Sequence, residues 1–68
     1  MAMMELTVNG EKRSFPGESL VGLLADLNLQ GKPCAIEINR QLVPASEHAD
    51  RQLADGDTVE ILTLVGGG

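Results

Sequence analysis

The 68-residue chain is long enough for one small domain, and 43% of its residues are hydrophobic. A chain of this size buries only about 60% of its unfolded surface, so one helix packed on one sheet is about the core that it supports. The net charge of −5 disfavours binding to nucleic acids and to anionic membranes, which are themselves negative. Neither a membrane span nor a signal peptide is predicted, and one cysteine cannot form an internal disulfide, so we expect a cytoplasmic protein.

A β-hairpin is the first predicted element. Apolar and polar residues alternate over residues 4–8, which is the period of a half-buried strand. Asn9-Gly10 follows, and this pair favours a type I′ turn because both residues tolerate positive φ. Residues 11–15 are therefore expected to return as a second strand, with Phe15, the only aromatic residue, directed into the core.

A short amphipathic helix is predicted next. Leucines recur at i, i+3, i+4 and i+7 between Leu20 and Leu27, and Ser19 is a suitable N-cap. Gly22 costs up to about 1 kcal/mol relative to alanine within a helix, and we expect it to allow close packing on the sheet. Asn28 is suited to the left-handed conformation that ends many helices.

The second half of the chain predicts three more strands. Alternation over residues 34–38 indicates a third strand, and residues 42–43 a short edge segment that ends at a proline. One helical or 3₁₀ turn over residues 46–51 and an Asp-Gly-Asp turn at residues 55–57 lead into a last strand over residues 58–65.

The faces of this last strand differ. Val59 and Ile61 continue the inward alternation, which leaves Leu62 and Leu64 on the opposite face. A chain this short has few residues left to cover the face of the sheet opposite the core. We therefore expect these leucines to be exposed. An exposed apolar patch of this kind is typical of a partner-docking surface.

The order of elements is hairpin, helix, strand, short turn, strand. A helix between strands of one sheet implies a right-handed crossover, and we expect the first and last strands to be parallel neighbours. A mixed sheet of four to five strands wrapped on one main helix is the β-grasp, or ubiquitin-like, α+β fold. We expect one domain over residues 1–65 and a flexible glycine tail over residues 66–68.

Gly66, Gly67 and Gly68 follow the last strand. Glycine has no Cβ, so three in a row give a thin, flexible segment that suits a narrow channel in another protein. Four extended residues from Val65 onward reach about 13 Å, at roughly 3.3 Å each. The carboxylate of Gly68 is a poor electrophile, and an enzyme must convert it to a mixed anhydride before a nucleophile displaces anything. A group carrier fits this pattern, although glycines alone also fit a frayed terminus or an expression scar.

No side chain is assigned a catalytic or metal-binding role. Cys34 alternates with isoleucines and is expected in the core, and His48 is expected to be solvated, with no second ligand nearby in sequence. Asp55 and Asp57 are interpreted as turn formers. No glycine-rich loop precedes a helix, so the chain is not expected to bind ATP or another cofactor by itself.

The chain resembles the ThiS family, the sulfur carriers of thiamine biosynthesis, and more distantly the small subunit of molybdopterin synthase. The resemblance rests on residues 4–10, 35–39, 42–44 and 53–62, followed by Val65-Gly66-Gly67-Gly68. Together these segments cover most of the chain from Met4 onward. The family pattern requires a terminal diglycine, which Gly67 and Gly68 match, while Gly66 is an additional glycine.

The resemblance implies a carrier protein and not an enzyme. An E1-like adenylyltransferase of the ThiF type would use ATP and Mg²⁺ to adenylate the Gly68 carboxylate. Sulfur from a cysteine desulfurase persulfide would then leave a thiocarboxylate at Gly68, and a thiazole synthase of the ThiG type would receive the sulfur.

Several alternatives share this activation step, so the tail does not separate them. They are a sulfur carrier for molybdopterin synthesis or tRNA thiolation and a ubiquitin-like modifier joined to lysines. A plain interaction module with an incidental glycine end is the alternative from a different class. A binding module should tolerate an added terminal residue, whereas a carrier should not.

Overall fold

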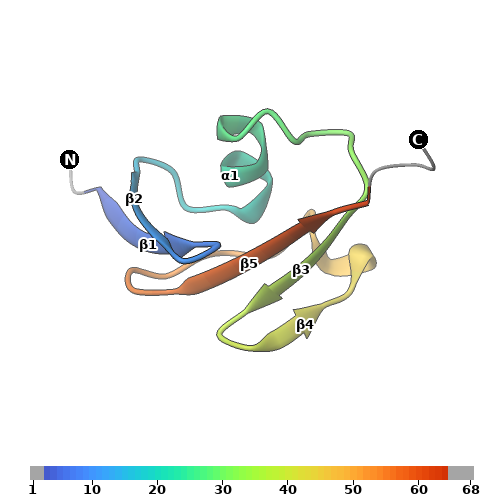
Figure 1. Cartoon of the computed structure of the whole chain (residues 1–68). Coiled ribbons are helices and arrows are strands. Elements are labelled where there is room, and N and C mark those ends of the chain that lie inside the picture. The colour runs from blue at the N-terminus through green and yellow to red at the C-terminus, as the bar shows by residue number, and fades with distance from the viewer. Residues whose placement is uncertain (1–2, 65–68) are drawn as a thin grey trace.

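The computed structural model describes residues 3–64 and contains one helix, one 3₁₀ turn and five strands within them (Figure 1). The strands are β1 (Met4–Val8), β2 (Glu11–Phe15), β3 (Cys34–Ile38), β4 (Gln41–Val43) and β5 (Thr58–Thr63), the helix is α1 (Leu20–Asp26), and the 3₁₀ turn η1 spans Ala45–Glu47. The strands form one mixed sheet in the order β2-β1-β5-β3-β4. The predicted ββαββ arrangement with one main helix is confirmed.

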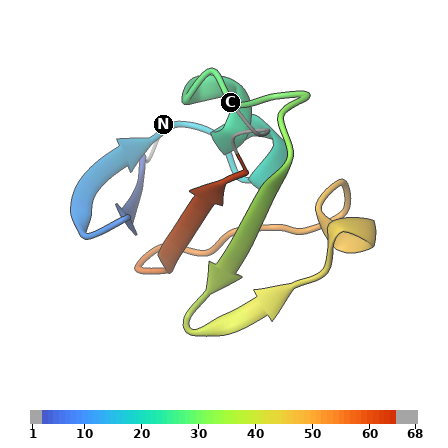
Figure 2. The same cartoon turned by 45° about the vertical axis from the view of Figure 1, so that its right-hand side comes forward.

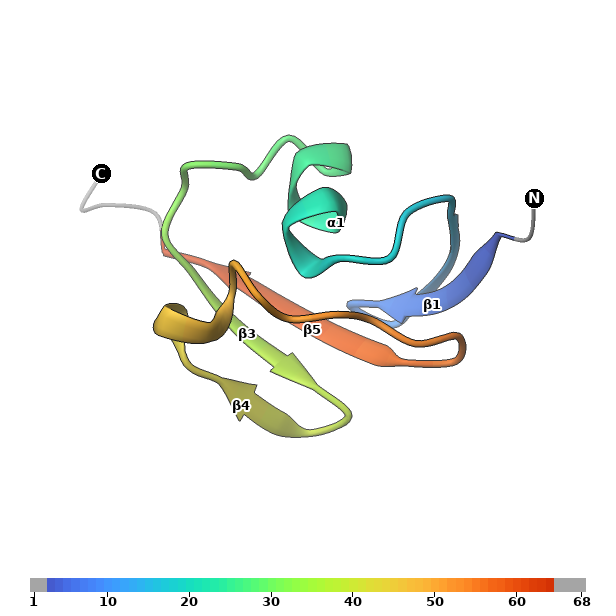
Figure 3. The same ribbon diagram turned by 180° about the vertical axis from the view of Figure 1, so that it is seen from behind.

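The layers are simple. Helix α1 lies over one face of the sheet, and the two hairpins lie on either side of β5, as Figures 1 and 2 show. The 3₁₀ turn η1 follows β4 at the edge of the sheet, and the segment after it runs back to β5 (Figure 3). No helix within residues 3–64 has the length and apolar character needed to cross a membrane.

Most predicted boundaries agree with the structure. The bounds of β1, β2 and β3 are those predicted, and β4 begins one residue earlier than expected. The turn predicted over residues 46–51 is a 3₁₀ turn, one of the two forms expected, but it begins one residue earlier, because Pro44, with φ of −58°, starts it at Ala45. The last strand ends at Thr63; the predicted end at residue 65 and the predicted tail over residues 66–68 lie outside the described residues.

The helix is built as its sequence predicts. The Ser19 hydroxyl accepts a hydrogen bond of 3.0 Å from the backbone N–H of Gly22, which caps the first turn. The chain leaves α1 through Asn28, whose φ is +61°, the left-handed conformation expected there. A Cβ atom on Gly22 would lie 3.3 Å from the Phe15 ring, so glycine does allow the helix to pack closely on β2.

The core between α1 and the sheet is almost entirely aliphatic. Phe15 is 3% exposed and is its one aromatic member. The other buried hydrophobic residues are Leu6, Val8, Leu20, Leu23, Ile36, Ile38, Val43, Leu53, Val59 and Ile61. Cys34 is half-buried at the margin of this cluster, so its predicted place in the core holds in part.

Strand β5 lies in the middle of the sheet. It pairs in parallel with β1, with Val8 opposite Val59, and this confirms the predicted neighbours. On its other side it pairs antiparallel with β3, with Ile36 opposite Ile61. Both neighbours are needed to satisfy its backbone groups, so β5 is the strand on which the two hairpins meet.

The side chain of Asn9 extends the β1–β5 ladder beyond the end of β1. The Asn9 backbone N–H donates to the Val59 carbonyl at 2.9 Å, and the chain then turns away with φ of +50° at Asn9. The side-chain amide of Asn9 then forms the next hydrogen bonds to β5. Oδ1 accepts from the Ile61 N–H at 2.7 Å, and Nδ2 donates to the Ile61 carbonyl at 3.2 Å. The amide thus replaces the peptide group that the turn removes.

Asn39 does the same on the other side of β5. It occupies the β3–β4 turn with φ of +52°, and its Oδ1 accepts from the Thr58 N–H at 3.0 Å. Its Nδ2 donates to the Asp57 carboxylate at 2.9 Å, and that carboxylate also accepts from the Ala54 N–H. The two asparagines therefore fix β5 from both sides, and we refer to Asn9 and Asn39 as the asparagine clamp.

Asn9→Gly tests the contribution of the clamp to stability. Glycine keeps the positive φ of the turn but removes both side-chain hydrogen bonds to Ile61, so the free energy of unfolding should fall by about 1–2 kcal/mol. Urea denaturation followed by circular dichroism measures this change.

Asn28→Gly is the matched control. Asn28 also has a positive φ, but no hydrogen bond of its side chain is found among residues 3–64. Its replacement should change the free energy of unfolding by less than about 0.5 kcal/mol. Equal losses in the two variants would show that the Asn9 amide contributes nothing specific.

Candidate functional site

The site is built around the C-terminal end of β5, because the three glycines follow this strand in the sequence. Beyond Thr63, the Leu64 N–H donates to the Pro33 carbonyl at 2.9 Å, which ties the last described residue to the segment before β3. The predicted reactive residue Gly68 and the predicted tail residues Gly66 and Gly67 lie outside the described residues. Their assigned roles therefore stay predictions.

Leu62 and Leu64 lie on the exposed side of this end. Leu62 is 67% exposed and Leu64 is 53% exposed, whereas Val59 and Ile61 are buried. The predicted difference between the two faces of the strand is confirmed. Side chains this apolar and this exposed are candidates for contact with another protein, although their docking role itself stays a prediction.

A shallow hollow of about 380 Å³ lies on the same side of the sheet as Leu62. Its lining comes from the β1–β2 turn and from β3, β4 and β5, and consists of Asn9, Ala35, Glu37, Leu42, Glu60, Ile61 and Leu62. Sequence reasoning did not single out Leu42, which is 67% exposed. Its position directly before the buried Val43 in a strand was the signal that could have placed it outward.

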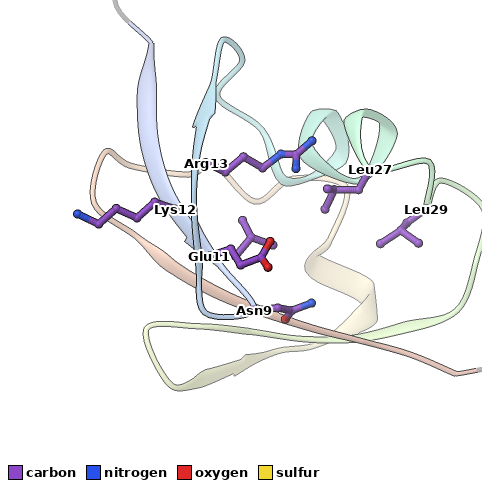
Figure 4. Close-up of a pocket in the computed structure, with 7 residues that line it drawn as sticks. Asn9, Glu11, Lys12, Arg13, Leu27 and Leu29 are labelled. Carbon is purple, nitrogen blue, oxygen red and sulfur yellow. The ribbon is translucent and has the colours of Figure 1, made fainter.

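A second hollow, of about 250 Å³, lies between the β1–β2 hairpin and the segment around the end of α1 (Figure 4). Its floor includes Leu27 and Leu29, while Lys12 points away from both of them. Arg13 forms an ion pair of 3.1 Å with Asp26, and both side chains are about two-fifths exposed. Such a pair contributes at most about 1 kcal/mol, and it links β2 to α1.

The chemistry of this second hollow is limited by its lining. Its seven residues are Val8, Asn9, Glu11, Lys12, Arg13, Leu27 and Leu29. None of these seven is a serine, cysteine or histidine, so they form no activated nucleophile of the kinds that those residues provide.

The remaining polar candidates serve the fold. Asp55 Oδ1 accepts from the Glu5 N–H at 2.7 Å and Asp57 accepts from Ala54, as expected for turn formers. His48 was predicted to be solvated, and this is wrong: it is half-buried, with Nε2 2.9 Å from the Val43 carbonyl. Among residues 3–64, no three histidine, cysteine, aspartate or glutamate side chains are grouped so as to hold a metal ion.

Several proteins resemble this chain along its length. The model of the ThiS family matches residues 6–68. The sulfur carrier protein ThiS of Thermus thermophilus is 36% identical over 61 residues, which are 90% of this chain and 95% of that protein. A thiazole synthase of Paramagnetospirillum magneticum is 39% identical over 66 residues, but the chain spans only 20% of its length.

A solved structure shares the fold. The crystal structure of the thiamine biosynthesis protein ThiS from Geobacter metallireducens matches with a TM-score of 0.76 and 33% identity. The match covers 96% of this chain and 100% of that one, so it extends over nearly the whole of the β-grasp arrangement. Family model, relatives and structure agree, and the chain belongs to the ThiS family.

Proposed function

We propose that this protein is a cytoplasmic sulfur carrier for thiazole formation in thiamine biosynthesis, with the carboxylate of Gly68 as the group that carries the sulfur. The observation that supports this most directly is the match to the sulfur carrier ThiS of Thermus thermophilus, which extends over nearly the whole of both chains. The family match also reaches residue 68 and so includes the three glycines.

In the proposed cycle, a carboxylate oxygen of Gly68 attacks the α-phosphate of ATP, and pyrophosphate leaves. The terminal sulfur of a protein persulfide then attacks the carbonyl carbon of the acyl adenylate, and AMP leaves. A thiol cleaves the resulting sulfur–sulfur bond and releases the thiocarboxylate. The partner binds ATP and Mg²⁺ and positions the Gly68 carboxylate, the ATP and the persulfide. The carrier contributes only its C-terminal carboxylate, held at the right place.

The proposed partners are an adenylyltransferase of the ThiF type, a thiazole synthase of the ThiG type and, as the indirect sulfur source, a cysteine desulfurase. The thiazole synthase of Paramagnetospirillum magneticum, part of which resembles this chain, supports the second of these. On this proposal the chain acts as a co-substrate of the other enzymes.

Strand β5, which precedes the glycines, is held rigidly in the sheet, and this suits the proposed role. β5 pairs on both sides with other strands, and its buried residues anchor it to the core. A tail attached to such a strand starts from a fixed position, so a partner that grips the domain also fixes the origin of the tail. Pre-organisation of this kind lowers the cost of placing the reacting atom.

Leu62→Ser combined with Leu64→Ser tests the predicted docking surface. Both leucines are exposed, so the variant should fold nearly as stably as wild type but bind the adenylyltransferase less tightly. Each truncated anchor should cost on the order of 1–2 kcal/mol, or roughly five- to thirtyfold in affinity. Isothermal titration calorimetry measures the affinity, and urea denaturation measures the stability.

Val21→Ser is the control for this experiment, because Val21 is a 44% exposed hydrophobic residue on α1, away from β5. Its binding should equal that of wild type. Unfolding of the double variant would place the leucines in the core, and unchanged binding would remove them from the docking surface.

Addition of one alanine after Gly68 tests the carrier chemistry. The new terminus is still a carboxylate, but the reacting carbon moves on by about 3.5 Å and gains a methyl group beside it. Because a displacement of 1 Å from attack geometry can cost about a hundredfold in rate, product should not accumulate. Intact-mass spectrometry after incubation with ATP, a persulfide source and the adenylyltransferase detects the exchange of one oxygen for sulfur.

Deletion of Gly68 is the complementary variant, because it shortens the reach by the same distance. It too should fail to form the thiocarboxylate, while both variants keep the stability of wild type. Conversion of the alanine-extended protein at the wild-type rate would overturn the proposed role of Gly68.

A further inference from the structure

The chain contains two lysines, Lys12 and Lys32, and Lys32 lies beside the end of β5. It directly precedes Pro33, whose carbonyl accepts from the Leu64 N–H at 2.9 Å. Consecutive Cα atoms are about 3.8 Å apart, and hydrogen-bonded partners in antiparallel strands are about 5.5 Å apart. The Lys32 backbone therefore lies within about 10 Å of Leu64, the last residue that the structure describes.

The side chain of Lys32 is available for a reaction. The residue is exposed, and neither a hydrogen bond nor an ion pair of its amine is found within residues 3–64, where the ion pair joins Arg13 to Asp26. Lysine carries its nitrogen on a flexible four-carbon stem and serves as a nucleophile towards carbonyl carbons. The other basic residues of the chain are arginines, which stay charged and do not react in this way.

The chain after Leu64 is long enough to reach this amine. Four extended residues span about 13 Å, which exceeds the separation of about 10 Å between Leu64 and the Lys32 backbone. A short flexible connection gives an effective concentration of about 1 mM. At about 10 μM protein, the Lys32 amine of the same chain therefore reacts with an activated Gly68 about a hundredfold faster than the same amine of another copy.

Lys12 lies too far away for the same reaction. It pairs with Thr7, and Thr7 pairs with Thr58, the first residue of β5. Six steps of about 3.3 Å separate Thr58 from Leu64 along the strand, and β2 lies two strand spacings of about 4.8 Å to the side. The Lys12 backbone is therefore about 22 Å from Leu64, well beyond the reach of four residues.

We propose that Lys32 captures an activated Gly68 when no sulfur is supplied, and so closes the chain into a ring. The inference rests on the proposed function, which supplies the acyl adenylate. Once the adenylate leaves the enzyme, the neutral Lys32 amine attacks its carbonyl carbon. The bond from that carbon to the phosphate oxygen breaks, AMP leaves, and the nitrogen gives up a proton to the solvent. The resulting isopeptide bond leaves no free C-terminal carboxylate to carry sulfur.

Lys32→Arg tests this assignment, because arginine keeps the positive charge but is not a nucleophile. The full chain is incubated with ATP, Mg²⁺ and a catalytic amount of the ThiF-type adenylyltransferase, without a persulfide source. Wild type should lose the mass of one water molecule, and peptide mapping should place the new bond between Lys32 and Gly68. The Lys32→Arg variant should form no ring, as intact-mass spectrometry would show.

Lys12→Arg is the matched control, since it makes the same substitution at the distant lysine. It should form the ring at the wild-type rate. Hydroxylamine should leave the ring intact, because it cleaves a thioester, such as one to Cys34, but not an isopeptide bond. A ring that hydroxylamine opens, or one that forms equally in Lys32→Arg, would overturn the assignment of Lys32.

A Gly68 thioester of the full chain, made by intein cleavage, separates this inference from the proposed function. It presents an activated Gly68 without the adenylyltransferase, and at mildly alkaline pH it should close in wild type and Lys12→Arg but not in Lys32→Arg. A wild-type thioester that does not close would overturn the inference, and so would adenylation by the enzyme that yields no ring. A wild-type chain that the enzyme never adenylates would instead overturn the proposed function, while closure of the thioester would still uphold the reach of Gly68 to Lys32.

Discussion

The position of β5 depends on two side-chain amides that act as backbone. Where β1 and β3 turn away, Asn9 and Asn39 continue their ladders onto Ile61 and Thr58, across 52 and 19 residues of sequence. Each asparagine also adopts the positive φ that its turn requires. One residue type thus forms the turn and secures the neighbouring strand, so that local and long-range structure are specified together.

The hydrogen bonds of Asn9 and Asn39 help to fix the register of β5 in the sheet. The side chains of a strand alternate with a period of two, so a slip of one residue would turn Ile61 outward and Leu62 into the core. Both faces of β5 carry large apolar residues at these positions, so hydrophobicity alone discriminates weakly between the two registers. Asn9 lines the hollow that Leu62 and Glu60 also line, so the hydrogen bonds that set the register lie beside Leu62 of the predicted docking surface.

Local patterns predicted most of the fold, because each element has a local cause. The Asn9-Gly10 turn, the Ser19 cap and the alternation of the strands could all be found from neighbours in sequence. Other features escaped prediction. The position of Glu37 opposite Glu60 depends on the β3–β5 register, which joins distant segments, and the half-buried state of His48 depends on the 3₁₀ turn after β4, which brings its ring back to the Val43 carbonyl.

The central position of β5 has a mechanical consequence. Hydrogen bonds in a sheet run roughly perpendicular to the strands, so a force applied along β5 from beyond Leu64 would stretch many of them at once rather than one after another. β5 is bonded on both sides, to β1 and β3, and the clamp adds further bonds in the same shearing geometry. On the proposed function, an enzyme that pulls on the C-terminal end of this chain would therefore do so without separating β5 from its sheet.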